Sequence, residues 1–162
     1  MRYHDYNLEG YSVRQNGAQI TLHLVFDYSG ASKDWSDIEF SDVLVYHFTH
    51  TGSAIITDIY EVPLALLVNE KKEVLAAWWK NYGGLGLWDD DAKIYGAKLE
   101  SEGYCAWRID SAIGFAGFII GKGIKQTEPN QTLQTTTRSS QFSTTFKQCD
   151  TTQNSVRVVS GR

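Results

Sequence analysis

The sequence predicts an α+β fold in which two helices pack on a mainly antiparallel sheet of about six strands. Three observations support this class. Between residues 12 and 60, an alternating apolar and polar segment is followed by a run that is apolar on both faces, as in strands. They follow three-and-four spacing after Pro63, as in amphipathic helices. Two further apolar runs follow Gly103. The expected order is therefore four strands, two helices and two strands.

The first two strands are predicted within Ser12–Tyr28, because Asn16-Gly17 is a turn signal that tolerates positive φ at both positions. After this turn, one face carries only apolar residues, namely Ile20, Leu22, Leu24, Phe26 and Tyr28. The other face, with His23, is mixed in character. We therefore expect one face in the core and the other solvated or partly covered.

A loop and two more strands are expected next. Gly30–Asp37 is small and polar, which is typical of a loop. From Ile38 to Phe48 the chain is apolar on both faces after a bulge near Ser41-Asp42, which indicates a central strand. Thr51-Gly52-Ser53 is expected to turn the chain into a further strand, Ala54–Tyr60.

Two helices are predicted after this sheet. Pro63 suits a first helical turn, and an amphipathic stripe runs from there to Tyr82, with a break near Asn69 left open. The second helix is expected to start at the carboxylates of residues 89–91 and to end at Gly103. The last two strands are then Tyr104–Asp110 and Phe115–Ile120, joined through residues 111–114.

Composition divides the chain near residue 124. Residues 1–124 contain all five Trp and all nine Tyr, and we expect them to form a single α+β domain. Residues 125–162 contain nine Thr, six Gln and five Ser. Such a segment buries too little apolar surface to offset an ordering cost of about 1–2 kcal/mol per residue, so a disordered tail is predicted.

Charge and cysteine content indicate the setting of the protein. Residues 1–124 carry 10 basic and 17 acidic residues, a net charge of −7, which disfavours nucleic-acid binding. Cys105 and Cys149 are the only cysteines, so no disulfide framework is expected and a reducing compartment is favoured. The N-terminus lacks the apolar run of a signal peptide, and the longest apolar stretch, residues 112–120, is shorter than a membrane span. A cytoplasmic protein without membrane contact is therefore predicted.

No motif predicts a catalytic residue, a metal site or a cofactor. The sequence has no Gly-x-Ser-x-Gly, CxxC or HExxH pattern, and the glycines at 83–86 follow a helix instead of a strand. His47 and His50 are three residues apart, so on a regular strand they point to opposite faces. The alternative function left open is an enzyme or small-ligand-binding domain with a pocket on the sheet formed by His23, His47, His50 and Asp58.

Two tryptophans lie among carboxylates, and this combination is typical of protein-binding hot spots. The partner-binding candidates are Asp34, Trp35, Asp37, Glu39, Asp42, Trp88, Asp89 and Asp90. The alternative is that both indoles fold back onto the core. The net negative charge suits a basic partner.

Four stretches within residues 3–67, HDYNLEGYSV, ITLHLVFDY, IEFSDVLVYHFTH and IITDIYEVPL, resemble an uncharacterised group of small bacterial proteins. The phrase I-x-F-x-D-V-x-x-Y-x-F also resembles strands of immunity-protein families from bacterial polymorphic-toxin systems. This resemblance implies a protein that neutralises a basic toxin domain by steric and electrostatic occlusion, and it assigns no functional residue. A structural or accessory domain is a third alternative. PNQTLQTTT resembles a phrase at the ends of unrelated bacterial reading frames, which implies an appended extension.

Overall fold

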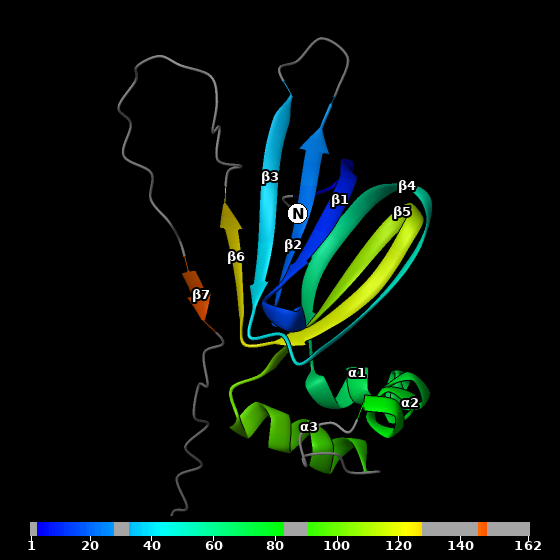
Figure 1. Ribbon diagram of the computed structural model, residues 1–162, viewed down its shortest axis with the longest axis vertical. Helices are drawn as coiled ribbons and strands as arrows, with labels where there is room; N and C mark the ends of the chain where they lie inside the picture. Colours follow the sequence, from blue (N-terminus) through cyan, green and yellow to red (C-terminus); the bar gives the residue numbers. More distant parts are fainter. Residues whose placement is uncertain (1–2, 28–32, 83–90, 128–145, 149–162) are drawn as a thin grey trace, which may run out of the picture.

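The computed structural model describes residues 3–27, 33–82, 91–127 and 146–148. In these residues, seven strands form one antiparallel sheet with the order β5-β4-β1-β2-β3-β6-β7 (Figure 1). The strands are β1 (Tyr6–Arg14), β2 (Gln19–Phe26), β3 (Asp34–Ser41), β4 (Val45–Val62), β5 (Cys105–Gly121), β6 (Gly123–Thr127) and β7 (Phe146–Gln148). The helices are α1 (Leu64–Glu70), α2 (Lys72–Tyr82) and α3 (Ala92–Ser101).

The predicted α+β class with an antiparallel sheet is confirmed. The single central strand predicted at Ile38–Phe48 is wrong, because its first part belongs to β3 and pairs with β2, whereas its last part belongs to β4 and pairs with β5. The first helix is divided in two, since Lys71 leaves the helical conformation at φ −108° and ψ 17°. The second predicted helix starts at its expected cap, where Asp91 Oδ1 accepts hydrogen bonds from the amides of Lys93 and Ile94.

The prediction of a loop at Gly30–Asp37 is wrong for its last four residues, which begin β3. Strand β3 pairs with β2 from Asp34↔Phe26 to Ser41↔Gln19. Asp34 and Ser36 on the inner face and Asp37 on the outer face are all polar, so the start of β3 has the composition of a loop. The buried positions are Ser36, Ile38 and Phe40.

The predicted turns at residues 51–53 and 111–114 are also wrong, because β4 and β5 each continue through them. The β4–β5 register shifts between His50 and Ile55, so the two strands bend together there. Gly114 has φ +75°, and a Cβ at this position would lie 1.9 Å from the Ser53 carbonyl oxygen. The small residues therefore allow curvature and close approach instead of a chain reversal.

The predicted disorder of residues 125–162 does not hold for two short segments. Residues 125–127 belong to β6, and β7 pairs with β6 through Gly123↔Gln148, Ile124↔Lys147 and Lys125↔Phe146. The boundary predicted at residue 124 therefore falls inside a strand. The remainder of the segment lies outside the described residues.

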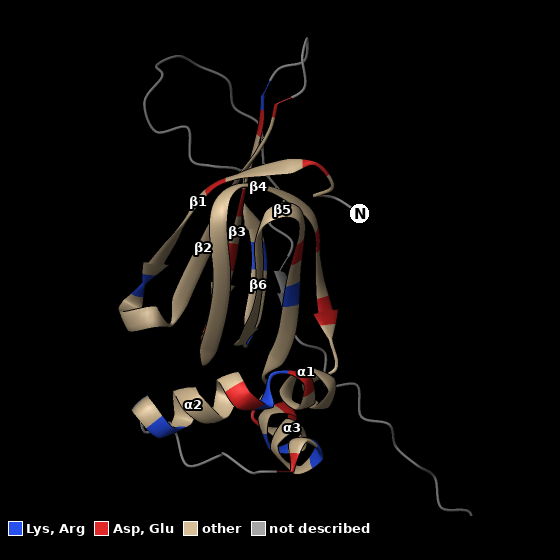
Figure 2. Cartoon of the chain, turned by 90° about the vertical axis from the view of Figure 1, so that its right-hand side faces the viewer, with Lys and Arg blue, Asp and Glu red and all other residues tan. Residues whose placement is uncertain are grey.

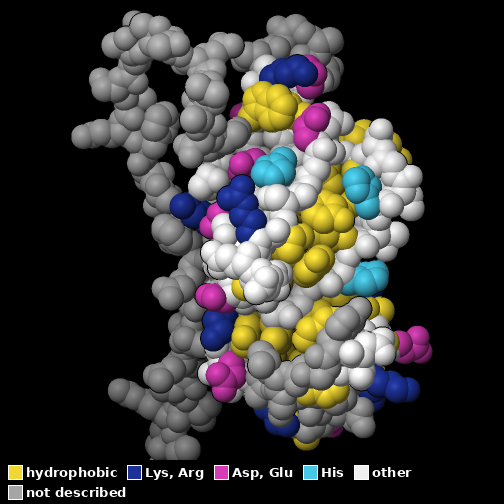
Figure 3. All heavy atoms as spheres, in the orientation of Figure 1, with side chains coloured by type: hydrophobic (Ala, Val, Ile, Leu, Met, Phe, Trp, Pro, Cys, Tyr) yellow, Lys and Arg dark blue, Asp and Glu magenta, His cyan; other side chains and the backbone are white. Residues whose placement is uncertain are grey.

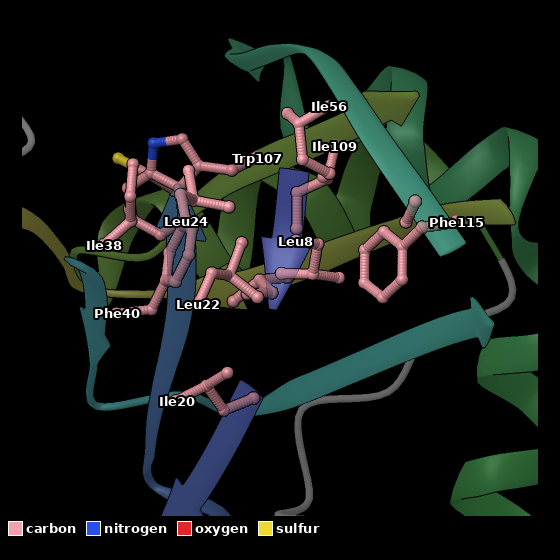
Figure 4. Packing of buried hydrophobic residues seen from close by; sticks show 13 residues of the cluster. Leu8, Ile20, Leu22, Leu24, Ile38, Phe40, Ile56, Trp107, Ile109 and Phe115 are labelled. Carbon is pink, nitrogen blue, oxygen red and sulfur yellow. The ribbon is translucent and has the colours of Figure 1, made fainter. Parts of the chain in front are cut away.

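The curled β4–β5 pair folds over the inner face of the sheet and encloses the main core (Figures 1 and 4). Figure 4 shows side chains from β1, β2, β3, β4 and β5 pointing toward one another. The rings of Phe40 on β3 and Trp107 on β5 have centroids 5.5 Å apart. The edge strand β5 therefore packs across the core onto β3.

A second core lies between the helices and the other face of the β4–β5 pair. It includes Phe118 and Ile120 of β5 together with Leu67 of α1 and Leu99 of α3. Helices α1 and α3 approach closely at Gly96, where a Cβ would lie 2.8 Å from the Ala65 amide nitrogen. In the described residues no helix has the length and hydrophobicity needed to cross a membrane.

The prediction about cysteine is corrected by Cys105, which is disulfide-bonded and only 7% exposed. Cys149 is the other cysteine of the sequence and lies outside the described residues. Disulfides persist mainly in oxidising compartments. The argument from cysteine content for a reducing compartment therefore loses its basis.

Candidate functional site

Strand β1 changes the direction of its side chains near Leu8. Leu8 pairs with Leu24, and after a register shift Tyr11 pairs with Leu22, so Leu8 and Tyr11 both point to the inner face. Strand β1 pairs with β4 only at Tyr6 and Asn7. Beyond these residues the two strands diverge, and side chains fill the space between them.

Five side chains around this divergence form what we call the aromatic surface: Tyr11, Tyr46, Phe48, His50 and Phe115. The Phe48 ring lies at its centre, with centroid distances of 5.1 Å to Tyr11, 5.3 Å to Tyr46 and 5.0 Å to Phe115. The His50 ring stands edge-on to Phe115 at 5.5 Å. Phe115 anchors the group, since it is only 4% exposed. The surface is therefore continuous with the core.

Large hydrophobic side chains in and beside the aromatic surface are partly exposed to solvent. Tyr11 is 39% exposed, Tyr46 37%, and Val13, two residues from Tyr11 on the same face of β1, is 41% exposed. These three are among the exposed large hydrophobic residues in the described part of the chain. Figure 3 shows hydrophobic side chains gathered between the β1–β2 pair and the curled β4–β5 pair, with histidines beside them.

The opposite, outer face of β1, β2 and β3 carries a hydrogen-bonded row of three side chains. His23 Nδ1 lies 2.9 Å from Asp37 Oδ1, and His23 Nε2 lies 3.2 Å from Ser12 Oγ. We call Ser12, His23 and Asp37 the outer row. We assign Nδ1–H as the donor to Asp37 Oδ1 and Nε2 as the acceptor of the Ser12 hydroxyl proton.

The strand register explains this row. Gly10, His23 and Asp37 lie directly opposite one another on the three strands. Gly10 has no side chain, and even a Cβ there would meet no atom within 4 Å. The imidazole can therefore reach across β1 to Ser12, which lies two residues further along the strand.

The described partner-binding candidates do not form one acidic surface. Trp35, Asp37 and Glu39 share the outer face, with Trp35 44% exposed. Asp34 lies on the inner face instead, and its Oδ2 accepts a hydrogen bond of 2.5 Å from the Tyr6 hydroxyl. Asp42 lies in the corner after β3 with φ +48°. Trp88, Asp89 and Asp90 lie outside the described residues.

Cations oppose one of these carboxylates, Glu39, and the nearby carboxylate of Asp27. Glu39 lies directly opposite Lys125 of β6, and Asp27 pairs with Lys33 at 2.8 Å. That hydrogen bond raises the pKa of Lys33. Figure 2 shows Asp and Glu spread over strands and helices instead of gathered on one face. The acidic character expected from the sequence is therefore distributed around the domain.

The residues of the alternative pocket are not brought together. His23 belongs to the outer row, and Asp58 lies opposite Asp110 on the β4–β5 pair. His47 stacks on Phe118 of the helix-side core, with ring centroids 6.0 Å apart. His50 faces the inner side, and its Nε2 lies 2.8 Å from the Gly52 carbonyl oxygen. The two histidines thus lie on opposite faces of β4, as strand parity predicts.

A polar network links the β4–β5 pair to α1. The Tyr60 hydroxyl donates to Asp110 Oδ2 at 2.9 Å, and Arg108 pairs with Glu70 of α1. Partial burial, followed by the hydrogen bond to Asp110, raises the pKa of Tyr60. We assign this network to the docking of the helix. Within the described ranges, no group of three or more His, Cys, Asp or Glu residues is placed to hold a metal ion.

Comparison with known proteins adds no assignment: no protein-family model, curated protein or solved structure matches this chain.

Proposed function

We propose that this domain binds another protein through the aromatic surface, and that the partner is a basic toxin domain which it neutralises by occlusion. The observation that carries the proposal is the set of partly exposed apolar side chains around Phe48, held on strands and anchored by buried Phe115. Contiguous exposed apolar surface typically marks an interaction site. Tyrosine supplies large contact area at low conformational-entropy cost.

The charge of the domain supports a basic partner. Residues 1–124 carry a net charge of −7, but the aromatic surface itself contains no carboxylate. Charge distributed around a binding surface mainly increases the association rate, whereas desolvated aromatic residues supply most of the affinity. We therefore expect salt to slow association and aromatic truncation to speed dissociation.

The immunity-protein resemblance supports the type of partner. The phrase I-x-F-x-D-V-x-x-Y-x-F runs from Ile38 to Phe48. Its first two apolar residues, Ile38 and Phe40, are fully buried, and its last two, Tyr46 and Phe48, belong to the aromatic surface. In this chain the phrase therefore combines core positions with binding positions.

The proposal does not include the cytoplasmic location expected from composition. The disulfide at Cys105 suits an oxidising compartment better. Peptide mapping of the purified protein without reductant, followed by fractionation of the source cells, decides this point. The binding proposal stands in either compartment.

The experiment is a binding and rescue assay with the product of the neighbouring gene. Tyr11→Ala combined with Tyr46→Ala is expected to weaken binding by about 30-fold or more, as for hot-spot residues worth about 2 kcal/mol. It should also abolish rescue from toxicity. The matched control is Leu66→Ala, which truncates a side chain of similar exposure, 47%, on α1.

The result is decisive in both directions when folding is checked by circular dichroism. Loss of binding only in the tyrosine variant supports the proposal. Equal binding by both variants contradicts the assigned surface, and absence of both complex and rescue favours the structural or accessory reading.

A further inference from the structure

The outer row has the connectivity of a nucleophile, a general base and an orienting carboxylate. Ser12 Oγ lies 3.2 Å from His23 Nε2, and Asp37 Oδ1 lies 2.9 Å from His23 Nδ1. A general base must be within hydrogen-bond reach of the proton that it removes, and a third group must orient it. These contacts meet both requirements.

The sheet holds the three side chains in place. Each comes from the middle of a different strand, and the β1–β2 and β2–β3 ladders are continuous around them from Gly10 to Arg14 and from Gln19 to Phe26. Sites built on strands are positioned more accurately than sites on loops. The outer row is therefore preorganised by backbone pairing.

We propose that the outer row is an acyl-transfer site for small activated esters, with Ser12 as the nucleophile, His23 as the general base and Asp37 as the positioning residue. Nothing in the proposed protein binding requires this activity, because the aromatic surface lies on the other face of β1. Ser12 and Tyr11 are adjacent in sequence and point in opposite directions.

Ser12 Oγ forms a bond to the carbonyl carbon while His23 Nε2 takes the hydroxyl proton. The bond between that carbon and the leaving oxygen breaks, and His23 returns the proton to the leaving alcohol. Water then attacks the acyl-serine with His23 again as base, which releases the acid and restores the Ser12 hydroxyl.

The solvent exposure of the outer row determines which class of substrate it can use. The side chains of His23 and Asp37 are 39% and 24% exposed, so solvent reaches the row. An open site offers little desolvation and few contacts to a large substrate. Good leaving groups such as phenolates are therefore expected to react, and peptide amides are not.

Other groups on this face set the electrostatic surroundings of His23. The charged residues that share it include Arg14 of β1, Asp37 and Glu39 of β3, Lys125 of β6 and the Asp27–Lys33 ion pair beyond the ends of β2 and β3. Arg14 lies two residues from Ser12 on the same side of β1. It is the cation best placed along this strand to favour an anionic transition state.

The test uses the full chain with a fluorophosphonate probe, which phosphonylates a base-activated serine and releases fluoride, and with p-nitrophenyl acetate. Intact mass and peptide mapping are expected to show one adduct, on Ser12. Ser12→Ala should abolish it, and His23→Gln should slow it by about 100-fold or more. Thr21→Val, which removes a hydroxyl directly opposite Ser12, is the matched control and should label normally.

Asp37→Asn has a readout that a purely structural role would not change. Asp37→Asn is expected to slow the labelling of Ser12 by about 10-fold or more, and Asp37→Glu, which restores a carboxylate, should recover part of the rate. Absence of an adduct, an adduct elsewhere, or a Ser12 adduct whose rate is unchanged in His23→Gln would overturn the proposal. Failure of this test leaves the binding assay with Tyr11 and Tyr46 unaffected, since it uses the other face.

Discussion

The two faces of β1 make different interactions: the inner face makes apolar contacts and the outer face makes polar ones. Tyr11 points to the inner side, where it contacts the Phe48 ring and continues the core outward. Ser12 points to the outer side, where it contacts the His23 ring through a hydrogen bond. One face therefore presents apolar area and the other presents directed polar groups.

This difference separates the proposed binding surface from the proposed acyl-transfer site on a single strand. Apolar contact is non-directional and scales with area, so the aromatic surface tolerates small shifts of its rings. A hydrogen-bonded row depends on distances of about 3 Å and on angle, so it depends on strand register. The bulge after Leu8 sets both faces, because it brings Tyr11 inward and Ser12 outward.

The largest expected effect lies on the inner face. Phe115→Ala should lower the free energy of unfolding by about 3–5 kcal/mol, because it leaves a cavity beneath the aromatic surface. Urea unfolding measures this loss. Ile113→Ala, two residues away on the same strand and 54% exposed, should change stability by no more than about 0.5 kcal/mol. Similar losses in both variants would contradict the assignment of Phe115 as the anchor.

Substitution of two glycines by alanine is expected to have an intermediate effect on stability. Gly114→Ala should cost about 3 kcal/mol, because it combines a positive φ with a contact to the Ser53 carbonyl that the backbone must move to relieve. Gly10→Ala on β1 should be neutral or stabilising by up to about 1 kcal/mol, since no atom lies within 4 Å of its added Cβ. Thermal unfolding followed by circular dichroism compares the two. A neutral Gly114→Ala would show that the bend of β4 and β5 does not need glycine.

The smallest effect on stability is expected in the outer row. Ser12→Ala removes one partly exposed hydrogen bond and should cost about 1 kcal/mol or less. Chemical denaturation of this variant beside the native chain tests the value. A loss above about 3 kcal/mol would indicate that the row is mainly a structural network and would weaken its assignment to chemistry.

Sequence patterns predicted the parts of the fold that depend on local periodicity. Ile20, Leu22 and Leu24 are fully buried on the expected face of β2, and Asp91 caps α3 as expected. The start of β3 is not predicted because Asp34, Ser36 and Asp37 are polar on both faces of the strand, as in a loop. The continuity of β4 and β5 was missed because Gly52 and Gly114 indicate turns locally, whereas here they lie in a bend shared by two paired strands.

The candidate sites depend on pairing that no local pattern contains. His23 was identified from the sequence, but its partner Ser12 becomes apparent only when the β1–β2 register is known. Asp37, which the sequence predicts as a binding residue, lies 2.9 Å from His23 Nδ1, and this contact is not predictable from the sequence. Tyr46, Phe48 and His50 alternate along β4, and this was the available signal for the aromatic surface. Tyr11 joins them only because β1 bulges.

The most direct test of the central claim compares adjacent residues on the two faces of β1. The dissociation constant of the neighbouring gene product is measured by calorimetry for the native chain, Tyr11→Ala and Ser12→Ala. Binding through the aromatic surface predicts a loss of about 10-fold or more for Tyr11→Ala and a change of less than about 2-fold for Ser12→Ala. Unchanged affinity in Tyr11→Ala, or an equal loss in both variants, would contradict the separation of the two faces.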